Sequence, residues 1–128
     1  MITGIHHIQL TAPPNSEDLA RKFYGELLGL LEIEKPAELK KRGGVWFEVG
    51  EQQLHIGIEP DSHAPRKSHP AFSVAGLDAV REQLEIAGYT TKSDELFIGY
   101  NRFYVRDPFG NRLEFMEPLE VRGDKVQG

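Results

Sequence analysis

The stretch DPFGNRLEF, residues 107–115, joins a tight turn to a strand. Its first five residues include Asp, Pro, Gly and Asn, the residue types that favour turns. After the turn, Glu114 separates Leu113 from Phe115, which is the period-2 pattern of a strand with one apolar face. We therefore predict a strand over residues 111–116, with Glu114 on the face opposite the apolar side chains.

The same pattern occurs in the first half of the chain. Leu54-His55-Ile56 matches Leu113-Glu114-Phe115, and His7-Ile8-Gln9-Leu10 matches His69-Pro70-Ala71-Phe72. Apolar spacing predicts a helix after each first strand, one between Ser16 and Gly29 and one over 77–87. The predicted strands are 5–12, 31–34, 45–49 and 53–58 in the first half and 69–75, 90–92, 102–106 and 111–116 in the second. The order of strand, helix and three strands thus occurs twice.

This repeat predicts an α+β fold in which two tandem βαβββ modules form a curled mixed β-sheet cup with the helices outside. The chain of 128 residues is long enough for one domain. We expect module 1 at about 1–59, a linker over 60–68, module 2 at about 69–118, and a tail over 119–128. The tail is predicted to be partly disordered because its last residues have little to bury.

Composition excludes several classes of function. There are no cysteines, so disulfides, Cys-type zinc sites and thiol nucleophiles are ruled out. The net charge of −5 argues against nucleic acid or an anionic membrane as a partner. No apolar run approaches the roughly 18 residues of a membrane span, and the first residues lack a signal-peptide pattern. The expected localisation is therefore cytoplasmic.

Four polar side chains are predicted to share the sheet face that the helices leave uncovered. The repeat makes His7 equivalent to His69, and His55 equivalent to Glu114, and strand alternation points all four away from the apolar face. Three imidazoles and one carboxylate suit a divalent metal with open positions. A hydrogen-bonded polar cluster without metal is the alternative.

The segments carrying these residues resemble the vicinal oxygen chelate superfamily, which includes glyoxalase I, methylmalonyl-CoA epimerase, extradiol dioxygenases, and fosfomycin and bleomycin resistance proteins. The resemblance covers HIQL (7–10), FYGELLG (23–29), HPAF (69–72) and DPFGNRLE (107–114). It implies paired βαβββ modules and metal positions at His7, His69 and Glu114. His55 matches the fourth position, where glyoxalase I has Glu and the epimerase has Gln. This departure counts against ordinary glyoxalase I activity.

The resemblance and the ligand set together imply a metal-dependent lyase, isomerase or transferase that acts on a small oxyanion-bearing molecule. The ion would be Ni, Co, Mn, Fe or Zn, and Glu114 would be the catalytic residue, as the one ligand that can also transfer a proton. A ring-cleaving dioxygenase and a non-catalytic drug- or metabolite-binding resistance protein are the alternatives. Arg102 and Tyr104 are candidate substrate-binding residues. We also expect a two-fold homodimer in which His7 and His55 of one chain face His69 and Glu114 of the other.

Overall fold

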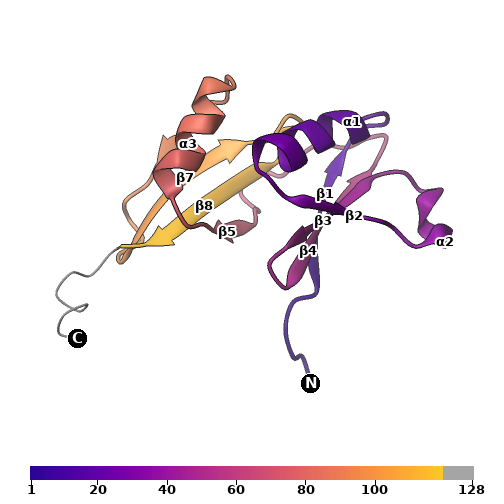
Figure 1. The fold of residues 1–128 in the computed structure, drawn as a ribbon, viewed down its shortest axis with the longest axis horizontal. Helices are drawn as coiled ribbons and strands as arrows, with labels where there is room; N and C mark the ends of the chain where they lie inside the picture. The colour runs from indigo at the N-terminus through magenta and orange to yellow at the C-terminus, as the bar shows by residue number, and fades with distance from the viewer. Residues whose placement is uncertain (120–128) are drawn as a thin grey trace. The chain divides into compact units, whose positions relative to one another are not determined.

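The computed structural model describes residues 1–119, in which the chain forms two compact units. The first unit contains residues 1–70 and takes in 106–112 as well, and the second contains 71–105 and the segment that begins at residue 113 (Figure 1). Apart from residue 119, the predicted tail lies outside the described residues. No helix within residues 1–119 is long and apolar enough to cross a membrane.

The first unit is a mixed four-stranded sheet with a helix against one face. Its strands lie in the order β1-β4-β3-β2; β1 pairs with β4 in parallel, and the other pairs are antiparallel. Its elements are β1 (His7–Ala12), α1 (Glu17–Ala20), η1 (Arg21–Leu27), β2 (Leu31–Ile33), α2 (Ala37–Lys40), β3 (Val45–Val49) and β4 (Gln52–Ile58). The connection between β2 and β3 thus contains one short helix, α2.

The long helix of this unit begins as an α-helix and continues as the π-helix η1. The backbone N–H of Leu28 donates to the carbonyl of Phe23, five residues earlier, at 3.0 Å. Phe23 and Tyr24 are both buried, and the Tyr24 ring lies 5.8 Å from that of Phe47 on β3. The helix therefore covers the sheet face opposite the one that carries His55.

The second unit repeats this plan. It consists of β5 (Ala71–Ser73), α3 (Leu77–Ile86), β6 (Lys92–Ser93), β7 (Tyr100–Arg106) and β8 (Arg112–Pro118). The strands lie in the order β5-β8-β7-β6, with β5 parallel to β8 and β6 antiparallel to β7. Its buried side chains include Leu84, Phe103 and Leu113. The predicted α+β fold of two βαβββ modules is confirmed. Each module forms its own open four-stranded sheet.

The register of the two sheets agrees with the sequence repeat. Gln9 pairs with His55 in the first sheet, and Ala71 pairs with Glu114 in the second. His7 and His69 each stand two residues before these pairs. The four candidate ligands thus occupy equivalent positions relative to the two sheets, although His69 itself belongs to the first unit.

The DPFGN turn belongs to the first unit and carries a buried polar network. One carboxylate oxygen of Asp107, Oδ1, accepts the backbone N–H groups of Phe109 and Asn111. The other, Oδ2, accepts the Tyr24 hydroxyl at 2.6 Å and the side-chain amide of Asn111 at 2.9 Å. Asn111 also donates to the carbonyl of Thr11 on β1. The network ties the turn to both the helix and the first strand.

Candidate functional site

Three rings stack on the open face of the first sheet. His55 on the inner strand β4 pairs with Trp46 on β3, and their ring centroids are 3.8 Å apart with planes only 1° from parallel. The His7 ring from β1 lies 4.0 Å from the other side of His55, inclined by 16°. His55 is 4% exposed, whereas His7 is exposed. Strand alternation predicts that His7 and His55 share this face. The parallel pairing of β1 with β4 then brings their rings into contact.

The environment of His55 keeps its imidazole neutral. Burial, and then electrostatic interactions with His7, His6 and Lys35, lower the pKa of His55 to about 4. Its Nε2 lies 2.8 Å from the side-chain oxygen of Gln53, which accepts a hydrogen bond from the tautomer that carries its hydrogen on Nε2. A neutral imidazole is the form that ligates metals.

The donor types at His7 and His55 fit a divalent ion, but the stacked arrangement does not aim both at one point. The lone pair of an imidazole nitrogen lies in the ring plane, and these planes are nearly parallel and 4.0 Å apart between centroids. At least one ring has to turn before the two can converge on an ion. Within residues 1–119, no three His, Asp or Glu side chains gather into a group that could hold a metal ion.

A cavity of about 340 Å³ opens beside these rings. This volume suits a small molecule. All of its lining residues belong to the first unit, and they include two cations but no carboxylate. They are His7, Gln9, Lys35, Leu39, Arg42, Gly43, Trp46, His55, Ile56, Gly57 and Ile58.

Glu114 on β8 is buried beside an arginine of the second unit. Arg102 Nη1 lies 3.0 Å from Glu114 Oε2 and 2.9 Å from the Tyr104 hydroxyl, and Nη2 lies 3.2 Å from Asp94. The guanidinium also stacks over the rings of Phe97 and Tyr104. The buried Nε of Arg102 has no hydrogen-bond partner within the described chain.

The structure thus brings His7 and His55 together and gives Glu114 a cationic partner. His69 lies just before β5, with Nδ1 2.6 Å from the carbonyl of Lys67. A single site formed by all four candidate ligands remains a prediction, as does the substrate role of Arg102 and Tyr104.

Sequence reasoning missed the cations of the cavity. Lys35 and Arg42 flank the segment around α2, where charged residues occur without the periodicity of a strand or long helix. Nothing in that pattern indicates that the segment lies beside the sheet. Gln53 could have been found, because it stands two residues before His55 and therefore on the same face of β4.

The sequence matches the family model of the Glyoxalase/Bleomycin resistance protein/Dioxygenase superfamily over residues 4–115. A glyoxalase family protein from Bacillus anthracis is 48% identical, with a TM-score of 0.89 over 93% of this chain and 98% of that one. No curated protein gave a significant match.

Two more distant structures share the fold. Lactoylglutathione lyase from Agrobacterium tumefaciens is 23% identical, with a TM-score of 0.70 over 91% of this chain and 94% of that one. A genomically encoded fosfomycin resistance protein from Listeria monocytogenes is 19% identical, with a TM-score of 0.73 over 93% and 96%. With its two βαβββ units and its match over most of its length, the chain belongs to the Glyoxalase/Bleomycin resistance protein/Dioxygenase superfamily.

Proposed function

We propose that this protein is a metal-dependent lyase, isomerase or transferase that acts on a small oxyanion-bearing molecule chelated to the metal. His7, His55, His69 and Glu114 are the residues that would hold the ion. The observation that carries the proposal is the repeated register, in which Gln9 pairs with His55 and Ala71 with Glu114. A donor set that follows the internal symmetry of the fold is expected for a site that uses both modules.

The chemistry of the donor set supports an anionic substrate. Three neutral imidazoles and one carboxylate leave one net positive charge around a divalent ion. When bound, such an ion supplies Lewis-acid polarisation to the oxygens that it binds. Suitable substrates are an enediolate, a hydroxy acid, a phosphonate or a catecholate.

Glu114 is the only carboxylate of the proposed set, so it is the candidate for moving a proton to or from the substrate. Arg102 Nη1 lies 3.0 Å from Oε2 of this carboxylate and holds it in position. The carboxylate is also only 5% exposed at the level of the residue, which limits exchange with bulk water. Both features favour transfer to a bound substrate.

We further propose that two chains share the site. Each unit covers one face of its sheet with a helix, and the open face needs a partner. In a two-fold homodimer, His7 and His55 of one protomer would face His69 and Glu114 of the partner subunit. Each dimer would then contain two equivalent sites.

Metal analysis of the purified protein tests the metal proposal directly. Single Ala substitutions at Glu114 and His69 should remove most of the bound ion. His63→Ala is the matched control, because His63 is exposed and bonds only to the carbonyl of Asp61 among the contacts described. Unchanged metal content in Glu114→Ala would contradict the proposal.

Mixing two defective variants tests the shared site. Neither His55→Ala nor Glu114→Ala contains an intact site, but a heterodimer of the two would contain one. Metal binding should therefore reappear after the variants are mixed and allowed to exchange subunits. A protein that remains monomeric at micromolar concentration while binding metal would rule this arrangement out.

A ring-cleaving dioxygenase is the second candidate, because His7, His69 and Glu114 form the two-histidine, one-carboxylate set of non-haem iron oxygenases. Oxygen uptake by the Fe²⁺-loaded protein in the presence of catechols would favour it. Saturable ligand binding without turnover of any substrate class would instead favour a binding protein.

A further inference from the structure

Two cations line the same cavity as the stacked rings. Lys35 lies between β2 and α2, and Arg42 lies between α2 and β3, so the short helix separates them along the chain. Both side chains line the cavity together with His7 and His55. The cavity is therefore lined by two of the four candidate metal ligands and by two cations.

Within residues 1–119, neither cation forms an ion pair with a carboxylate, as other basic residues do. Arg21 pairs with Glu32, and Arg102 pairs with Glu114. The Arg42 side chain forms no hydrogen bond or ion pair within residues 1–119, and its backbone N–H donates to the carbonyl of Leu39 at 3.1 Å. Lys35 donates to the backbone carbonyl of Gly43.

The two positive groups also act on each other. Burial lowers the pKa of Lys35, the charge of Glu17 partly opposes this, and the charge of Arg42 lowers the pKa further. Glu17 does not line the cavity, and its Oε2 accepts the backbone N–H of Gly44 at 2.8 Å. An anion entering the cavity would relieve the repulsion between the cations and accept charge-assisted hydrogen bonds.

Building on the proposed function, we propose that the substrate carries a second anionic group, a carboxylate or a phosphonate, which is bound by Arg42 and Lys35. The first oxyanion lies at the His7–His55 end of the cavity, and the second lies at the α2 end. Leu39, Trp46 and Ile58 supply apolar surface for the carbon body between them. The substrate class is therefore a small molecule with an anionic group at each end of an apolar centre.

Intrinsic fluorescence gives a direct readout of this cavity, because Trp46 is the only tryptophan of the chain and lines it. The full-length protein, freed of metal with EDTA, is titrated with benzoate, phenylphosphonate and the neutral analogue benzamide. Both anions should change the Trp46 emission saturably, and benzamide should bind at least about tenfold more weakly, since a hydrogen bond to a charged group is lost.

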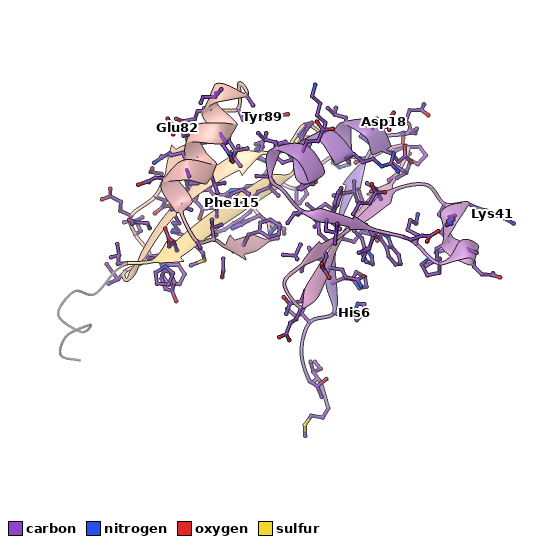
Figure 2. The ribbon with its side chains drawn as sticks, viewed as in Figure 1. His6, Asp18, Lys41, Glu82, Tyr89 and Phe115 are labelled. Atoms are coloured by element: carbon purple, nitrogen blue, oxygen red, sulfur yellow. The ribbon has the colours of Figure 1, made fainter. Side chains whose placement is uncertain are left out.

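Arg42→Gln and Lys35→Gln remove one charge each, and Lys41→Gln is the matched control. Lys41 directly precedes Arg42, is exposed, and does not line the cavity; it is labelled at the end of α2 in Figure 2. Arg42→Gln should weaken binding of the anions about tenfold and leave that of benzamide unchanged. Lys41→Gln should bind the anions like the unsubstituted protein.

Three outcomes would overturn the inference. They are equal weakening by Lys41→Gln and Arg42→Gln, binding of benzamide as tight as that of benzoate, and no saturable change with either anion. Preference for benzoate or phenylphosphonate distinguishes a carboxylate from a phosphonate as the second group.

This test is separable from that of the proposed function because it needs no metal. Arg42→Gln should retain the metal content of the unsubstituted protein, since Arg42 is not a proposed ligand. Loss of anion binding with metal binding intact isolates the second anionic subsite. Anion binding to a protein that takes up no metal would leave this subsite standing and contradict the proposed metal centre alone.

Discussion

Arg102 and Glu114 form an almost fully buried ion pair on the neighbouring strands β7 and β8, with Nη1 3.0 Å from Oε2. The side chains are 13% and 6% exposed, so water screens the pair only weakly. The carboxylate proposed to bind a metal thus has a cationic partner within its own unit, which it shares with Asp94. Arg102 thus fixes the position of the Glu114 carboxylate.

Replacing Arg102 with Met should destabilise the protein, because the Glu114 carboxylate then stays buried without its cation. We expect a loss of about 3 kcal/mol in the free energy of unfolding, measured by urea denaturation. Adding Glu114→Gln to Arg102→Met should restore part of the loss, which a double-mutant cycle quantifies. Unchanged stability with weakened ligand binding would instead assign Arg102 to the substrate.

Tyr24→Phe should destabilise the first unit by removing the hydroxyl that donates to Asp107 at 2.6 Å. The residue is fully buried, so no water replaces the lost donor. The free energy of unfolding should fall by about 1–3 kcal/mol, which is measured as a lower midpoint concentration in urea denaturation. A midpoint shift within experimental error would show that Asn111 alone satisfies this carboxylate oxygen.

The stability of α3 should depend on pH through Glu117. Its carboxylate accepts the backbone N–H groups of Gly76 and Leu77 at the start of the helix, and these bonds lower its pKa. A carboxyl whose pKa is lower in the folded state stabilises that state above its unfolded pKa. This stabilisation is lost as the pH falls through the lowered folded value.

The melting temperature of Glu117→Gln should therefore lie below that of the unsubstituted protein at neutral pH, and the difference should shrink as the solution becomes acidic. Glu82→Gln is the control, because Glu82 is an exposed residue on the same helix (Figure 2). A difference that stays constant between neutral and acidic pH would contradict the role of the ionised carboxylate.

Gly44 and Gly57 should respond differently to replacement by Ala. A Cβ at Gly44 would lie 2.3 Å from the carbonyl oxygen of Ile56, and the backbone φ there is +91°. At Gly57 the nearest atom is the side-chain nitrogen of Gln9, at 2.7 Å, which can move away. Thermal denaturation should show a marked loss for Gly44→Ala and a small one for Gly57→Ala. Equal losses would mean that Gln9 is held rigidly in the cavity.

The sequence predicts the fold well where alternation is strong and less well where backbone hydrogen bonding decides. The strand over 45–49 has the predicted bounds. The one predicted over 69–75 is shorter and begins at Ala71, because Pro70 has no N–H to donate to a ladder. The π-helical winding of η1 has no signature in the apolar stripe, since a buried face requires only approximate periodicity.

The candidate site, like the fold, could be predicted in part from the sequence. Strand alternation places His55 on the open face, and register then explains its contact with His7. The partners of Glu114 are harder to predict, because the pairing of Arg102 with it depends on how two strands align. The cavity cations were missed because they flank a segment with no periodic pattern.

The hydrogen bonds of Asp107 and Asn111 make the two halves of this chain complementary fragments rather than interchangeable building blocks. The turn comes late in the sequence, yet it completes the packing of the first half through Tyr24 and Thr11. A chain ending in the 60–68 linker would lack the Asp107 carboxylate and the Asn111 amide that bind this hydroxyl and this carbonyl. Such a half would have to receive the turn from another molecule, so a gene split at the linker should yield two pieces that fold only when they are present together.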